Sequence, residues 1–182
     1  MKRHKILIVD DEPFVRRALE RALREIDNTE VIEAESGPKA LELIEEHEVH
    51  LVISDERMPE MTGVEFLKEV KRRHPDVIRI ILTGYADIKA AIAAINEGEI
   101  YRYLTKPWDA DDLLLTVRQA LQLYDLLRTN QELRRTVERQ IAHLHALERK
   151  YPGITKVERD DDGMIVLPGE IEGGDLEVSS AP

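Results

Sequence analysis

Five polar side chains of the sequence could do chemistry together. Each follows a short apolar run, and they comprise three carboxylates, one hydroxyl and one ammonium: Asp10, Asp11, Asp55, Thr83 and Lys106. Three carboxylates brought close together repel one another, so such a site needs a cation. Oxygen ligands without His or Cys favour Mg²⁺. One carboxylate could then attack a phosphoryl group, while the ammonium neutralises phosphoryl charge and the hydroxyl donates to it.

Each of these residues also has an ordinary structural interpretation. Two aspartates before a helix often cap its N-terminus. Thr83 with Gly84 could be a simple turn, and Lys106 with Pro107 a surface loop. The phosphoryl-transfer hypothesis therefore depends on the whole set, because five residues of complementary chemistry recur at the ends of separate apolar runs.

The apolar runs predict the elements that position these side chains. They are rich in Ile and Val, which is typical of buried parallel strands, and they cover residues 5–9, 31–34, 51–54, 78–82 and 100–104. Segments with helical periodicity follow each of them. Strand and helix thus alternate five times, which predicts an α/β fold with a five-stranded parallel sheet covered by helices on both faces. Ligands bind such sheets beyond the carboxyl ends of the strands.

Four sequence blocks resemble the receiver domain of two-component response regulators. They read KILIVDDEP, LVISDERMPEMTGVEFL, IILTGYAD and YRYLTKPW, and the resemblance extends from residue 5 to about 122. It implies a doubly wound, flavodoxin-like sheet with strand order 2-1-3-4-5. It also implies that Asp55 accepts a phosphoryl group from a sensor histidine kinase or a phosphotransfer protein. Asp11, Asp55 and the backbone carbonyl of Arg57 would bind Mg²⁺, with Asp10 assisting.

The same resemblance implies roles for the residues around the phosphoryl group. Thr83 and Lys106 would contact it, and Tyr103 would be the switch aromatic that turns inward when Thr83 moves. Arg57 and Tyr85 flank the opening to the phosphoryl group, so we expect them to tune dephosphorylation.

An enzymatic alternative is a Mg²⁺-dependent phosphohydrolase that works through an aspartyl phosphate. Haloacid dehalogenase-like phosphatases need a second acid two residues after the nucleophile, and here that position is Arg57. We therefore expect a regulator that is not an enzyme. We expect His4, His47, His50 and His74 to be surface residues outside the site.

The last helix is unusually long. It should start at Asp109, with Asp112 in a variant of the capping box, and no Gly or Pro interrupts it before Pro152. With Leu123 as position a, apolar residues recur at the a and d positions over about four heptads. Apart from Gln140, they form the predicted coiled-coil seam: Leu123, Leu126, Asn130, Leu133, Val137, Leu144, Leu147 and Tyr151.

This seam predicts a parallel homodimer, because an Asn at position a, here Asn130, favours a coiled coil of two parallel helices in fixed register. Two alternatives remain. The helix could fold back on its own domain, or Leu127 and Ile141 could broaden the stripe for a four-helix arrangement or another partner.

The chain thus divides into four predicted parts. Residues 1–122 are the receiver, residues 123–151 the coiled-coil stalk, residues 152–168 a short β-hairpin-like segment and residues 169–182 an acidic disordered tail. Asp162 and Gly163 would form the hairpin tip.

Composition restricts the function further. The 182 residues carry a net charge of −11, which opposes binding to nucleic acid. The chain has no Cys, and its early apolar run is too short for a signal peptide or a membrane span. We expect a cytoplasmic protein that signals to an unknown downstream protein by protein–protein contacts. The alternative is that the chain is the N-terminal fragment of a longer regulator.

Overall fold

Strand and helix alternate through the first part of the computed structural model, which describes residues 3–84, 88–96, 99–153, 158–159 and 165–166. The chain forms two units, Met1–Glu132 and Leu133–Pro182. The elements of the first unit are β1 (His4–Val9), α1 (Pro13–Leu23), β2 (Thr29–Ala34), α2 (Gly37–Glu46), β3 (Leu51–Asp55), α3 (Gly63–Arg73), β4 (Ile78–Thr83), α4 (Ile88–Asn96), β5 (Arg102–Thr105) and the start of α5 (Ala110–Lys150).

The five strands form one parallel sheet in the order β2-β1-β3-β4-β5, which confirms the fold expected from the sequence. The register places Asp55 beside Leu82 and Thr83 beside Thr105. The carboxyl ends of β3, β4 and β5 therefore meet at one edge of the sheet, as the resemblance required.

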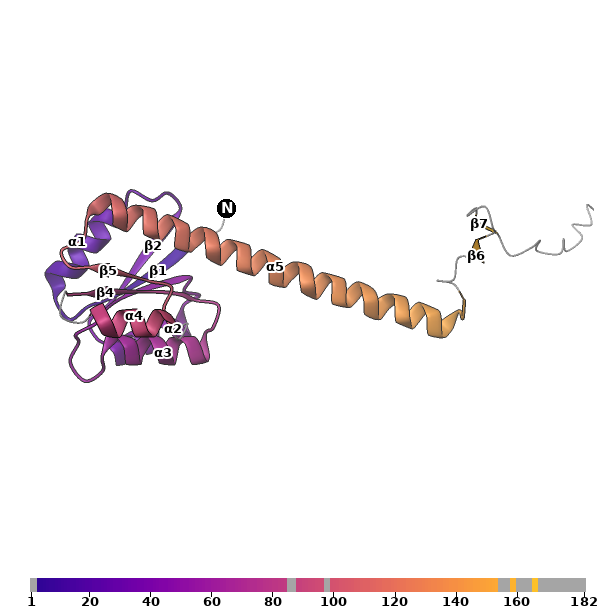
Figure 1. Cartoon of the computed structure of the whole chain (residues 1–182), viewed down its shortest axis with the longest axis horizontal. Helices are drawn as coiled ribbons and strands as arrows, with labels where there is room; N and C mark the ends of the chain where they lie inside the picture. The colour runs from indigo at the N-terminus through magenta and orange to yellow at the C-terminus, as the bar shows by residue number, and fades with distance from the viewer. Residues whose placement is uncertain (1–2, 85–87, 97–98, 154–157, 160–164, 167–182) are drawn as a thin grey trace, which may run out of the picture. The chain divides into compact units, whose positions relative to one another are not determined.

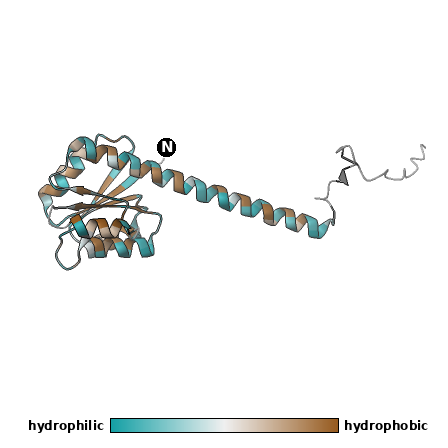
Figure 2. Ribbon diagram, viewed as in Figure 1, coloured by the Kyte–Doolittle hydropathy of each residue, from teal (hydrophilic) through white to brown (hydrophobic). Residues whose placement is uncertain are grey.

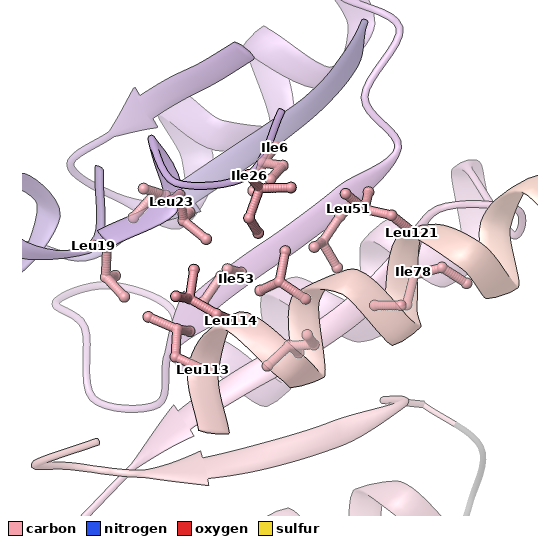
Figure 3. Close-up of a cluster of buried hydrophobic side chains, with 14 of the residues drawn as sticks. Ile6, Leu19, Leu23, Ile26, Leu51, Ile53, Ile78, Leu113, Leu114 and Leu121 are labelled. Carbon is pink, nitrogen blue, oxygen red and sulfur yellow. The ribbon is translucent and has the colours of Figure 1, made fainter. Parts of the chain in front are cut away.

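Helices cover both faces of the sheet (Figure 1). One apolar layer joins α1 and α5 to the sheet, and the other joins α2, α3 and α4. In Figure 3, Leu113, Leu114 and Leu121 of α5 gather with Leu51 and Ile53 of β3. Burying an aliphatic side chain of this size contributes about 1.5–3 kcal/mol, so these layers hold the strand ends in place.

The start of α1 explains why the two aspartates that follow β1 are available for chemistry. Glu12 is the N-cap residue of α1, and Pro13 occupies the first turn. The interpretation of Asp10 and Asp11 as helix caps is therefore wrong. Helix α3 starts with a full capping box, in which Thr62 accepts from the N–H of Glu65 and Glu65 accepts from that of Thr62.

Strand β5 starts two residues later than the apolar pattern predicts. Ile100 precedes the strand because its N–H bonds to the carbonyl of Ala94 at the end of α4. The strand then runs from Arg102 to Thr105.

Helix α5 is one continuous helix of 41 residues. Its start is capped as predicted, since the carboxylate of Asp109 accepts from the N–H of Asp112 at 3.0 Å. Hydrophobic residues recur along its whole length (Figure 2). The helix ends at Lys150, so Tyr151 lies one residue beyond it, although its N–H still bonds to the carbonyl of Leu147.

In the second unit, two short strands follow α5. β6 (Glu158–Arg159) and β7 (Ile165–Val166) pair antiparallel. The predicted hairpin tip, at Asp162 and Gly163, and the predicted tail, residues 169–182, lie outside the described residues. Within the described part of the chain, no helix has the length and apolarity needed to cross a membrane.

Candidate functional site

The ammonium of Lys106 lies between two carboxylates at the carboxyl edge of the sheet. Its Nζ is 2.7 Å from Oδ2 of Asp10 and 2.5 Å from Oδ1 of Asp55. Asp10 directly follows β1, Asp55 ends β3, and Lys106 follows β5. Three chain segments far apart in sequence thus supply three of the five predicted residues.

Asp10 is fixed by its own chain segment. It is fully buried, and its Oδ1 accepts from the N–H of Glu12 at 2.8 Å. Arg16 donates to its backbone carbonyl at 2.6 Å and also binds Glu33 on β2. The neighbouring Asp11 is exposed, so its carboxylate lies on the solvent side of the cluster.

Asp55 is buried but has a defined set of partners. Its Oδ2 accepts from the N–H of Arg57 at 3.0 Å, while Oδ1 faces Lys106. Burial raises the pKa of the Asp55 carboxyl, and Asp10 adds to this effect, whereas Lys106 opposes it. The environment therefore disfavours the carboxylate in the absence of a further cation.

Lys106 stays charged in this position. Burial by itself would lower its pKa, but the hydrogen bonds to Asp10 and Asp55 outweigh that effect and the pKa is raised. One ammonium thus serves two buried carboxylates, and the cluster keeps an excess of negative charge.

This excess of negative charge shows whether the site is suited to Mg²⁺. Among the described residues, no three His, Cys, Asp or Glu side chains are grouped so that they alone could hold a metal ion. The carboxylates of Asp10 and Asp55, with the exposed Asp11 next to Asp10 in the chain, would offer oxygen donors to an ion, and their charge favours a cation. A hard cation that retains water ligands fits this donor set.

Thr83 ends β4 beside the cluster. It is fully buried, and its hydroxyl donates to the carbonyl of Gly84 at 3.1 Å. Its own carbonyl accepts from the N–H of Lys106 at 2.8 Å, so β4 positions the start of the Lys106 loop. Tyr103 is half-buried and packs against the layer formed by α2, α3 and α4. Tyr85 lies outside the described residues.

The structure adds two residues that the sequence patterns did not reveal. Gly63 begins α3, and a Cβ there would lie 2.1 Å from the carbonyl oxygen of Asp55. Glu56 accepts from the N–H of Val64 at 3.2 Å and so caps α3 beside the cluster. Nothing in the sequence marks Gly63, since a glycine after Thr62 reads as an ordinary helix start.

The predicted seam residues differ in their surroundings. Leu123 is half-buried and packs against the core of the first unit. Leu147 is also half-buried. The remaining six are exposed: Leu126, Asn130, Leu133, Val137, Leu144 and Tyr151.

The chain is similar in sequence to known response regulators. The sequence profile of the response regulator receiver domain matches residues 6–118. The hydrogenase transcriptional regulatory protein HoxA of Bradyrhizobium diazoefficiens is 38% identical over 160 residues, covering 88% of this chain and 33% of that protein. The DNA-binding transcriptional regulator NtrC of Escherichia coli is 37% identical over 124 residues, covering 68% of this chain and 26% of that one.

A solved structure is also similar to this chain. The response regulator receiver domain protein of Clostridium thermocellum is 37% identical with a TM-score of 0.64, and the match covers 68% of this chain and 98% of that one. The chain spans about a third or less of the length of these two curated relatives.

Proposed function

The chain belongs to the response regulator receiver family, and on that premise we propose that Asp55 accepts a phosphoryl group from a sensor histidine kinase or a phosphotransfer protein. The observation that carries this proposal is the buried carboxylate of Asp55, bonded to Lys106 on one oxygen and to the Arg57 N–H on the other. In the transfer, an Asp55 oxygen bonds to phosphorus while the phosphorus–nitrogen bond of the donor histidine breaks. The leaving nitrogen keeps the electron pair.

The other residues of the cluster take the roles that their positions permit. Asp11, Asp55 and the Arg57 carbonyl would hold Mg²⁺ with help from Asp10, and the ion would neutralise phosphoryl charge. Lys106 would exchange a carboxylate partner for a phosphoryl oxygen.

Three more residues respond to the phosphoryl group. Thr83 would turn its hydroxyl from the Gly84 carbonyl to the phosphoryl group, and Tyr103 would move inward with it. Arg57 and Tyr85 would set the rate of dephosphorylation.

The proposed output passes through the long helix. We propose a parallel homodimer that pairs along the exposed seam and presents a phosphorylation-dependent surface to a downstream protein. In this proposal the chain is a cytoplasmic regulator without enzymatic activity, and it does not itself bind nucleic acid. Because the matched relatives bear the names of transcriptional regulators, we propose that the response is transcriptional.

The test is to add acetyl phosphate with Mg²⁺ and measure the intact mass of the full chain, with Asp55→Asn as the control. One phosphoryl group on the wild type and none on the variant supports the proposal. Continuous release of phosphate from simple phosphate esters would instead identify a phosphohydrolase that works through an aspartyl phosphate.

One observation favours a second candidate. The match to HoxA is longer than the receiver match, so it includes residues beyond the receiver. This candidate is that the chain is the N-terminal part of a longer transcriptional regulator. An immunoblot of cells that express the natural gene decides between the two by the size of the protein detected.

A further inference from the structure

Helix α5 stays attached to the amino-terminal edge of the sheet after it leaves the apolar core. His4 Nε2 lies 2.9 Å from Oδ1 of Asp125. Three and six residues further along the helix, Arg128 donates to Glu48 and Gln131 donates to Asp76, each at 2.7 Å. We name these six residues the edge clasp: His4, Glu48, Asp76, Asp125, Arg128 and Gln131.

The edge clasp is built on a buried base. Tyr124 is 8% exposed and His50 is 3% exposed, and their rings meet edge to face with centroids 4.8 Å apart. The Nδ1 of His50 accepts from the N–H of Lys5 at 2.9 Å, which fixes its ring. Arg128 donates to the hydroxyl of Tyr124 at 3.3 Å as well as to Glu48. The exposed contacts are thus attached to side chains that packing already orders.

The helical repeat separates the clasp from the seam. At about 100° per residue, Arg128, Gln131 and their buried neighbour Tyr124 fall within roughly 60° of one another around the helix axis, and Asp125 lies about 60° to the side of Arg128. Leu126 and Asn130 fall on the opposite side by the same count. The structure agrees, since Leu126 is 65% exposed and Asn130 is exposed.

We propose that the edge clasp is the receiver's own docking contact for the first heptad of the stalk, and that it leaves Leu126 and Asn130 facing a second copy of the chain. This inference rests on the proposed homodimer. Its consequence is that the coiled coil starts within the first unit, before Leu133. Pairing then requires no release of α5 from the sheet.

The clasp is tested by hydrogen exchange on the full chain. Arg128→Ala with Gln131→Ala should speed amide exchange over residues 124–131 several-fold, and leave residues 137–147 unchanged. Arg135→Ala is the matched control, because it removes the same side chain two turns later on the same face of the helix. Unchanged exchange in the double variant overturns the clasp, and so does an equal increase in the control.

The direction of the free face is tested by disulfide crosslinking, since the chain has no Cys of its own. Leu126→Cys and Leu147→Cys both occupy d positions, and Glu132→Cys occupies an outward c position. Crosslinked dimers of the first two and none of the third support the inference. A crosslink at Leu147→Cys alone overturns it, because the coil would then start after the first unit. A monomer with no crosslink refutes the proposed homodimer and this inference with it, whereas the exchange measurement still reports on the clasp.

Discussion

The first residue of α3 touches the backbone of the proposed phosphoacceptor. A Cβ on Gly63 would lie 2.1 Å from the carbonyl oxygen of Asp55, and the N–H of Gly63 donates to the carbonyl of Glu56 at 2.9 Å. The end of β3 and the start of α3 are therefore packed backbone to backbone. No side chain can be inserted without moving one of them.

Gly63→Ala should accordingly destabilise the protein by about 2–3 kcal/mol, because overpacking against backbone has no flexible side chain to absorb it. Urea unfolding measures the change. Gly84→Ala is the matched control at the same edge of the sheet, since a Cβ there meets nothing within 4 Å. A loss of stability in the control equal to that of Gly63→Ala would contradict the steric explanation.

Asp55→Asn should raise the thermal midpoint at pH 7 in the presence of a chelator. Burial raises the pKa of Asp55 in the folded state, so the charged carboxylate lowers the free energy of unfolding. Below the ordinary carboxyl pKa both states are protonated and the cost is absent. It grows as the pH rises and is complete above the folded-state pKa.

The stability difference between wild type and Asp55→Asn should therefore shrink as the pH falls towards 3. Adding Mg²⁺ at pH 7 should stabilise the wild type more than the variant. A variant that is less stable than wild type at pH 7 in chelator would show that the pair with Lys106 outweighs the cost of burial.

Lys106→Met should destabilise the fold by about 3–5 kcal/mol, because it leaves two buried carboxylates without their shared ammonium. Calorimetry at neutral pH measures the loss. Combining it with Asp10→Asn should recover part of the stability, since one of the two unpaired charges is removed. An additive double variant would exclude the electrostatic explanation.

Glu60→Gly should stabilise the protein by about 0.5 kcal/mol. Glu60 has φ +68°, a left-handed conformation that costs a residue with a Cβ about 1–2 kcal/mol, and the flexibility of Gly in the unfolded chain offsets part of the gain. Asn28, at φ +58°, serves for comparison. Asn28→Gly should change the stability less, because Asn tolerates this conformation.

Leu144→Asp should weaken the proposed dimer by at least tenfold, because it places a charge in the seam. Sedimentation equilibrium measures the dissociation constant. Ala142→Asp introduces the same side chain at an outward f position and should leave it within about threefold. A wild type that sediments as a monomer at micromolar concentration would refute the proposed dimer.

The strands were predictable from local patterns, and their order was predictable from the resemblance to the receiver domain. Ile- and Val-rich runs fix buried strands, and the receiver blocks placed Asp10, Asp55, Thr83 and Lys106 at one edge. The pairing of Lys106 with both Asp10 and Asp55 was not predictable. Periodicity assigns residues to faces of an element and does not reveal which side chains meet across loops.

The same limit explains an error about the histidines. His50 was expected on the surface, yet it is buried against Tyr124. Its position just before β3 resembles that of any loop residue, and the ring of Tyr124 that packs against it belongs to α5. Burial that depends on contacts over 70 residues away leaves no local signal.

The two ends of β3 lie at different functional parts of the first unit. Asp55 at its carboxyl end belongs to the candidate site, and His50, just before its amino end, forms the base under Tyr124. Since side chains alternate along a strand, a one-residue deletion within β3 would turn the interior side chains to the opposite face. Such a deletion would disturb the acidic cluster and the anchoring of α5 together, so the length of β3 is as strictly determined as the identity of Asp55.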